Sequence, residues 1–80
     1  MNRQEALELV LASLEKATKQ THEGITEDTD LIESEIIDSL DSMTLLFEME
    51  DMAGFSLGIS EDYEDYKVSS LIDLVVNAGS

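Results

Sequence analysis

The stretch Ile36-Ile37-Asp38-Ser39-Leu40-Asp41-Ser42-Met43 marks the point where an acidic segment becomes an apolar one. Asp and Ser are favoured at helix starts, because their side-chain oxygens accept hydrogen bonds from the first unpaired backbone amides. We therefore expect a helix from about Ser39 to Ala53, with Asp38 as its N-cap and Gly54 as its C-cap. The Ser39 hydroxyl should then be exposed and open to modification.

Helical patterns also occur near both ends of the chain. Apolar residues recur at steps of three and four from about Asn2 to Thr18, where Asn2 and Glu5 have the spacing of a capping box. A last helix is expected from about Ser69 or Ser70 to Asn77, with Ser70 as the candidate cap. Its β-branched residues would also suit a strand, but the sequence offers no second strand to pair with it.

The remaining segments complete the predicted fold. From about Lys19 to Asp38 the helical period is absent, and we expect the isoleucines and leucine of this long loop to pin it onto the helices. The acidic stretch Glu61 to Tyr66 could form one short helical turn. The prediction is an all-α, four-helix bundle with a short third helix and a long loop between helices one and two. We expect residues 1–80 to be a single domain.

The composition limits the possible partners. Nineteen acidic residues against four basic ones give a net charge of −15, which repels nucleic acid and anionic lipid and attracts proteins with basic surfaces. The chain has no cysteine, which excludes disulfides, a thiolate nucleophile and Cys-based metal sites and fits a reducing cytoplasm. It shows no apolar signal core and no apolar run near the roughly 20 residues of a membrane span. We expect a cytoplasmic monomer without membrane or nucleic-acid partners.

The expected helix from Ser39 to Ala53 has two apolar faces, which a domain of this size cannot bury equally. The larger face is the expected core face and consists of Leu45, Leu46, Met49 and Met52. The smaller face is expected to be exposed and consists of Leu40, Met43 and Phe47. It is rimmed by Asp41, Glu48, Glu50 and Asp51. Apolar anchors inside a charged rim are typical of a transient docking surface, although a helix that is apolar nearly all round is more often simply buried.

The triplet Asp38-Ser39-Leu40, in the middle of a short and very acidic chain with helical patterns on both sides, resembles the modification site of acyl carrier proteins. The stretch Ile25 to Leu31 is similar to the long connection between the first two helices of that family. The resemblance implies that Ser39 carries 4'-phosphopantetheine, with Asp38 and Leu40 beside the attachment site. It also implies that Asp38 and Asp41 contact a basic phosphopantetheinyl transferase.

For the whole protein, the resemblance implies a carrier without catalytic activity of its own. Acyl or aminoacyl groups would be held as thioesters and presented to the enzymes of fatty-acid or related biosynthesis, with the exposed face of the second helix as the docking surface. The approach from Glu33 to Ile37 lacks the glycine of many fatty-acid carriers, and Thr44 stands where they typically have glutamate. These departures favour a stand-alone carrier of a specialised pathway, and the cargo stays open.

Two other functions are compatible with the sequence. The first is an unmodified acidic interaction module, in which Leu40, Met43 and Phe47 bind a basic partner. The second is weak binding of divalent cations, but the stretch that begins at Asp28 lacks the glycine and glutamate of a calcium loop, so no metal ligand is assigned. The single histidine, His22, is expected to be a solvated loop residue.

Overall fold

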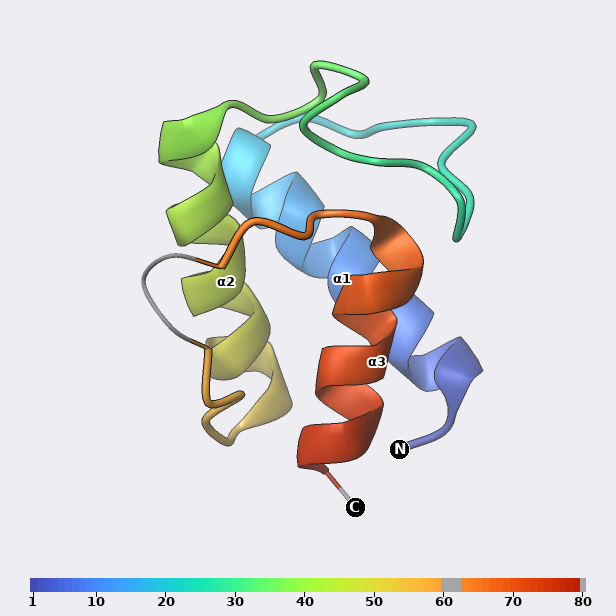
Figure 1. Ribbon diagram of the computed structural model, residues 1–80, viewed down its shortest axis with the longest axis vertical. Coiled ribbons are helices and arrows are strands. Elements are labelled where there is room, and N and C mark those ends of the chain that lie inside the picture. Colours follow the sequence, from blue (N-terminus) through green and yellow to red (C-terminus); the bar gives the residue numbers. More distant parts are fainter. Residues whose placement is uncertain (60–62, 80) are drawn as a thin grey trace.

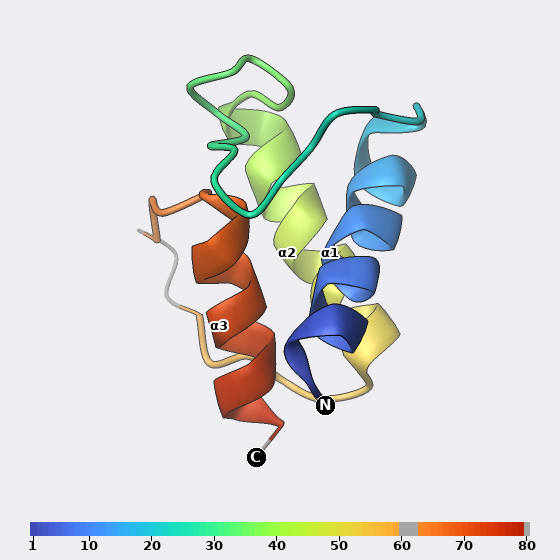
Figure 2. The same cartoon turned by 90° about the vertical axis from the view of Figure 1, so that its right-hand side faces the viewer.

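The computed structural model describes residues 1–59 and 63–79. These residues form three helices, α1 (Arg3–Thr18), α2 (Ser39–Ala53) and α3 (Val68–Ala78). Helix α1 packs against both other helices and runs opposite to them, so that the chain starts near the end of α3 (Figures 1 and 2). Residues 63–67 lead from the side of α2 to the start of α3 (Figure 1).

The predicted ends of the first two helices are confirmed. The Asn2 side chain accepts a hydrogen bond from the Glu5 amide at 2.8 Å, and the Glu5 carboxylate accepts one from the Asn2 amide at 3.3 Å, which completes the capping box. Helix α2 begins at Ser39 and ends against Gly54, whose φ of 79° lies in the left-handed region that glycine adopts without steric cost.

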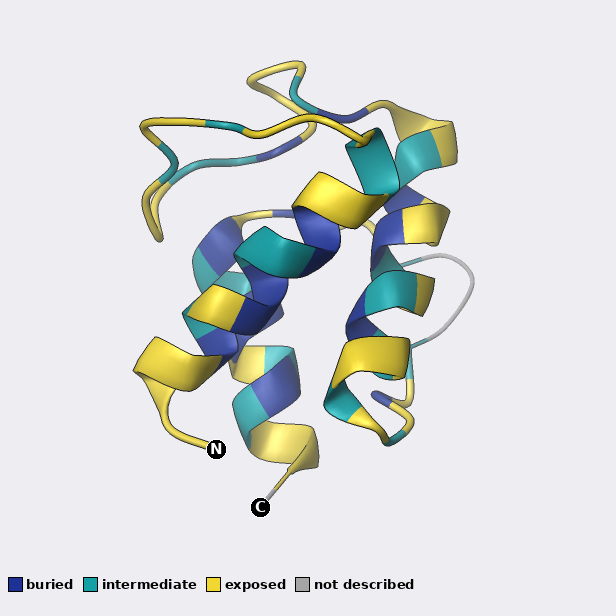
Figure 3. Cartoon of the chain, turned by 180° about the vertical axis from the view of Figure 1, so that it is seen from behind, coloured by how far each residue is buried: buried dark blue, intermediate teal, exposed yellow. Residues whose placement is uncertain are grey.

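The core lies where the three helices face one another, and Figure 3 shows their buried residues turned inward. Helix α2 contributes Leu45 and Met49, both fully buried as predicted. The prediction is only partly right for Leu46, which is half-buried, and wrong for Met52, which is 39% exposed. Met52 lies at the edge of the α1–α2 contact, where its sulfur accepts a hydrogen bond from the buried Ser13 hydroxyl at 3.3 Å.

The first turn of α3 is capped by the loop between α1 and α2. No side chain caps this helix, and its N-cap residue is Lys67. Instead, the Val68 amide donates to the Thr29 carbonyl and the Ser69 amide donates to the Glu27 carbonyl, each at 2.9 Å. The loop thereby pairs two amides that the first turn of a helix would leave without partners.

The predicted cap of the last helix is therefore wrong. Helix α3 begins at Val68 instead of Ser69 or Ser70, and the Ser70 hydroxyl donates to the Asp65 carboxylate at 2.7 Å. A side-chain cap at Ser70 is unnecessary because the loop carbonyls already pair the first amides. The choice of a helix over a strand for this segment is confirmed.

The expectation of a fourth, short helix over Glu61 to Tyr66 is also wrong. Residues 60–62 lie outside the described residues, and residues 63–67 contain no helix. The backbone in this stretch pairs with the loop instead: the Tyr66 carbonyl accepts a hydrogen bond from the Leu31 amide at 3.0 Å, and Asp30 forms an isolated β-bridge with Lys67. Over residues 1–59 and 63–79 the fold has three helices, not the four that were expected.

The side chains of the loop strengthen its attachment. Leu31 is fully buried and Ile37 is 3% exposed, as expected for residues that pin the loop, whereas Ile32 is 37% exposed. In the middle of the loop, the Glu27 carboxylate pairs with the Arg3 guanidinium at 2.7 Å, and Arg3 also pairs with Asp73 of α3 at 2.6 Å. These hydrogen bonds raise the pKa of Arg3, but all three groups are about half exposed, so the ion pairs add little to stability.

Replacing Leu31 should therefore weaken the whole domain. We expect Leu31→Ala to lower the free energy of unfolding by about 2 to 5 kcal/mol, because it leaves a cavity where the loop meets the core. The neighbouring variant Ile32→Ala is the matched control and should cost about 1 kcal/mol or less, since this side chain is partly in solvent. Urea denaturation followed by circular dichroism measures both values, and equal losses would contradict the anchoring role of Leu31.

Candidate functional site

Ser39 is the first residue of α2, and its side chain is exposed as the sequence predicted. The preceding Asp38 is the N-cap, and its Oδ1 accepts hydrogen bonds from the amides of Leu40 at 2.9 Å and Asp41 at 2.8 Å. Within the described part of the chain, no group forms a hydrogen bond with the Ser39 hydroxyl. The cap therefore fixes the first turn of the helix while it leaves this hydroxyl available.

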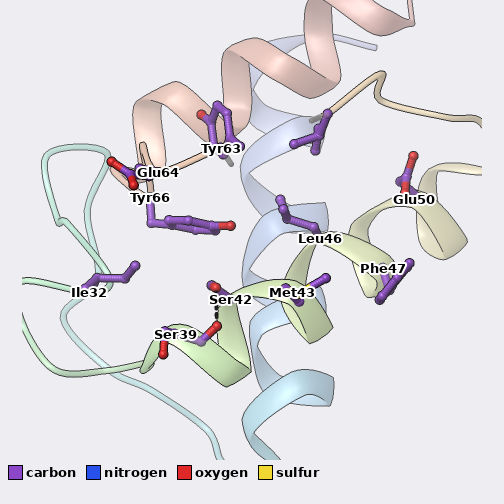
Figure 4. A pocket seen from close by; sticks show the side chains of 11 residues that line it. Ile32, Ser39, Ser42, Met43, Leu46, Phe47, Glu50, Tyr63, Glu64 and Tyr66 are labelled. Carbon is purple, nitrogen blue, oxygen red and sulfur yellow. Dashed lines mark hydrogen bonds between the residues drawn. The ribbon is translucent and has the colours of Figure 1, made fainter. Parts of the chain in front are cut away.

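A pocket of about 710 Å³ opens beside Ser39, between α2 and the segment that returns to α3 (Figure 4). Its α2 wall consists of Ser39, Ser42, Met43, Leu46, Phe47 and Glu50. Its other wall consists of Ile32, Ile59, Tyr63, Glu64 and Tyr66. Most of these side chains are apolar or aromatic, so the pocket suits an apolar group attached near its edge.

The smaller apolar face of α2 is exposed, as expected. The side chains of Leu40, Met43 and Phe47 are 80%, 52% and 64% exposed. Only Met43 and Phe47 line the pocket, whereas Leu40 does not. The three predicted docking residues therefore form one exposed face, of which two members also border the pocket.

The predicted acidic rim is not a single ring around this face. Of its four members, only Glu50 lines the pocket, and its carboxylate accepts a hydrogen bond from the Leu57 amide at 2.8 Å. This bond fixes the turn after α2, so Glu50 has a structural role. Asp51 is exposed, while Asp41 and Glu48 are half-buried, and none of these three lines the pocket.

A second, smaller hollow of about 430 Å³ lies at the start of α2. Asp38, Asp41 and Glu35 supply its acidic groups, and Ser39 lines both this hollow and the larger pocket. Ser39 thus borders an acidic surface and a largely apolar pocket at once.

The sequence analysis missed Tyr63 and Tyr66, which line the pocket opposite α2. Their rings contact edge to face, with centroids 5.6 Å apart and an angle of 76° between the planes. Tyr66 is 3% exposed and Tyr63 is half-buried. A usable signal was present, because these are the only tyrosines of the chain and large aromatic rings in an acidic segment tend to be packed.

Burial, and in smaller measure the nearby charges of Asp65, Tyr66 and Asp73, raise the pKa of Tyr63 to about 12. The neutral phenol is thereby favoured in the folded protein. The Tyr63 side chain therefore adds no charge to the pocket wall over the physiological range of pH.

Three further expectations concern groups outside the pocket. His22 is half-buried instead of solvated, and its Nε2 lies 2.8 Å from the Thr18 hydroxyl oxygen at the end of α1. Over residues 1–59 and 63–79, no three His, Cys, Asp or Glu side chains gather closely enough to hold a metal ion. No helix in the described part of the chain has the length and apolarity needed to cross a membrane.

Comparison with protein-family models, with curated proteins and with solved structures gives no significant match for this chain.

Loss of the Asp38 cap should destabilise the start of α2. We expect Asp38→Ala to lower the free energy of unfolding by about 1 kcal/mol, because two amides lose their acceptor. Asp38→Asn keeps an acceptor oxygen and should cost clearly less. Urea denaturation of both variants measures the difference, and an unchanged Asp38→Ala variant would contradict the capping role.

The Tyr63 environment predicts a loss of stability at high pH. An unfolded tyrosine ionises near pH 10, whereas Tyr63 in the folded protein ionises near 12, so the unfolded state binds fewer protons between these values. The contribution of Tyr63 to stability is complete below pH 10 and is lost as the pH rises toward 12. Spectrophotometric titration of the Tyr66→Phe variant isolates Tyr63, and a midpoint near 10 would contradict its protected position.

Proposed function

We propose that the protein is an acyl carrier that bears a 4'-phosphopantetheine arm on Ser39 and has no catalytic activity of its own. The observation that supports this proposal best is the free Ser39 hydroxyl, exposed on the first turn of α2 at the edge of a largely apolar pocket. An attached arm supplies a thiol that holds an acyl or aminoacyl group as a thioester. The protein then acts as a tethered substrate for successive enzymes.

The surroundings of Ser39 suit a phosphodiester. The first turn of an α-helix carries the positive end of the helix dipole, where anions are stabilised. The negative charge of Asp38 is engaged by two backbone amides, which offsets part of its repulsion toward a nearby phosphate. Asp41 adds negative charge that would attract a basic transferase.

Attachment of the arm is a phosphoryl-group transfer. The Ser39 oxygen forms a bond to the phosphorus that bears the pantetheine unit of coenzyme A, and the bond from that phosphorus to the departing adenosine bisphosphate breaks. The hydroxyl proton passes to the magnesium-dependent transferase, which supplies the catalytic groups. The carrier contributes only the accessible acceptor.

The exposed face of α2 is the docking surface in this proposal. Leu40 and Phe47 present apolar area that stays largely in solvent, and the net charge of −15 favours encounters with basic enzymes. Such enzymes of acyl metabolism would bind the carrier in turn. We place this monomeric carrier in the cytoplasm. A chain without cysteine forms no disulfides, so its stability does not depend on an oxidising compartment.

A second candidate function is an unmodified acidic interaction module. It is favoured by the same exposed residues Leu40, Met43 and Phe47, which could bind a basic helix or surface without any modification of the neighbouring serine. The two functions differ in one consequence: only the carrier needs the Ser39 hydroxyl.

The carrier function predicts a single covalent modification. Incubation of the purified chain with coenzyme A, magnesium and a broad-specificity phosphopantetheinyl transferase should add the mass of one phosphopantetheine, because one hydroxyl is presented on the helix start. Intact-protein mass spectrometry measures the gain, and fragmentation locates it.

Two serine variants make this experiment selective. Ser39→Ala should remove the mass gain completely while leaving the circular dichroism spectrum unchanged. Ser56→Ala changes another exposed serine, outside α2, and should be modified like the unaltered chain. No gain in the unaltered protein, or a gain that persists in Ser39→Ala, would favour the interaction module.

A further inference from the structure

Tyr66 presents an unpaired hydroxyl inside the pocket. The residue is 3% exposed, yet its hydroxyl forms no hydrogen bond with any residue that the structure describes. Figure 4 shows the Tyr66 ring lying across the pocket, with its oxygen directed toward the space between Leu46 and Ser42. The Tyr63 ring, by contrast, turns away from α2 in the same view.

The hydroxyl oxygen is reached by solvent through the pocket, since the described residues contain no buried side-chain oxygen that lacks a hydrogen-bond partner. A chain that fills the pocket would displace this solvent, and the phenol would then be unfavourable unless the chain supplied a new partner. Around this hydroxyl, Leu46 and Met43 offer no acceptor. A group that enters the pocket could supply the missing partner. The position of Tyr66 therefore indicates which chemical groups the pocket can bind.

The other polar groups of the pocket define the chemistry of that partner. The Ser42 hydroxyl donates to the Ser39 carbonyl at 2.7 Å, so its proton is already used. Glu50 is an acceptor that binds the Leu57 amide. The hydroxyls of Ser39, Tyr63 and Tyr66 form no hydrogen bond with the described residues, and of these three residues only Tyr66 is buried and directs its hydroxyl toward α2 (Figure 4). The group that the Tyr66 hydroxyl fits is a hydrogen-bond acceptor.

Charge restricts the acceptor further. Glu50 and Glu64 both line the pocket, and the protein carries a net charge of −15. An anionic acceptor would be repelled by these carboxylates, whereas the oxygen of a ketone or an alcohol would not. An alcohol could also donate to the oxygen of Ser42, whose lone pairs are free to accept.

We propose that Tyr66 is a specificity-determining residue that selects a neutral oxygenated cargo. Its hydroxyl donates a hydrogen bond to an oxo or hydroxy oxygen on an acyl chain in the pocket, and this favours oxo- and hydroxyacyl groups over saturated chains of equal length. The inference rests on the proposed carrier function, since attachment at Ser39 is what brings a chain to the pocket. It adds the class of cargo that the site prefers.

The absence of cysteine allows a test without any transferase. In the Ser39→Cys variant the introduced thiol is the only one in the chain, so a probe thiol can be attached there as a disulfide. The probes are octanethiol and a set of its analogues. Each analogue carries a single ketone, at a different mid-chain carbon. Because residue 39 lines the pocket, a chain tethered there reaches the interior.

The concentration of 2-mercaptoethanol that releases half of each probe measures how strongly the pocket holds it. We expect the best-placed ketone to require about tenfold more reductant than the saturated chain, because the saturated chain displaces solvent from the Tyr66 hydroxyl without replacing its hydrogen bond. The infrared stretch of its ¹³C-labelled carbonyl should shift to lower frequency. Adding Tyr66→Phe should abolish both differences, while adding Tyr63→Phe, the matched control, should preserve them.

Equal retention of all ketones and the saturated chain, or ketone retention that survives Tyr66→Phe, would overturn the inference. Tyr66→Phe keeps the ring and its packing, and its circular dichroism spectrum verifies that the variant folds. A lack of phosphopantetheine on the unaltered chain is a separate result that would contradict only the carrier function. The two failures are therefore distinguishable.

Discussion

The structure depends on the contact between the loop after α1 and the start of α3. Helix α3 has no side-chain cap, and the carbonyls of Glu27 and Thr29 pair its first two amides. Leu31, fully buried, anchors the same loop in the core. A long acidic loop and an uncapped helix would each be unfavourable alone, and each satisfies the backbone groups that the other leaves unpaired.

This contact also shapes the pocket. Because the Tyr66 carbonyl pairs with the Leu31 amide, the segment before α3 stays non-helical and places the Tyr66 ring opposite α2. The opposite wall is fixed at the start of α2, where Asp38 holds the first turn and leaves the Ser39 hydroxyl free. The modifiable Ser39 hydroxyl and the wall of the pocket that carries the Tyr66 hydroxyl thus come from separate parts of the chain and meet at one place.

Local patterns predicted the parts of the fold that are determined locally. The ends of α1 and α2 follow from capping residues, and the exposure of Leu40, Met43 and Phe47 follows from helical periodicity. Residues 63–67 were misread because their structure depends on pairing with a loop more than thirty residues earlier in the chain, which no local period reveals. Likewise, nothing in the sequence marks the left-handed backbone of Glu35, with a φ of 62°, because this conformation is uncommon outside glycine. The aromatic character of Tyr66 indicated a packed ring, but its place opposite α2 depends on the same long-range pairing.

The central claim is that Ser39 is an attachment point and not merely the first residue of a helix. Mass spectrometry of the protein purified from its natural source, under conditions that preserve thioesters, tests this claim most directly. The account predicts a phosphopantetheine arm on the peptide that contains Ser39, in at least part of the material, together with an acyl group on its thiol. A homogeneous population in which that peptide has its unmodified mass would contradict it.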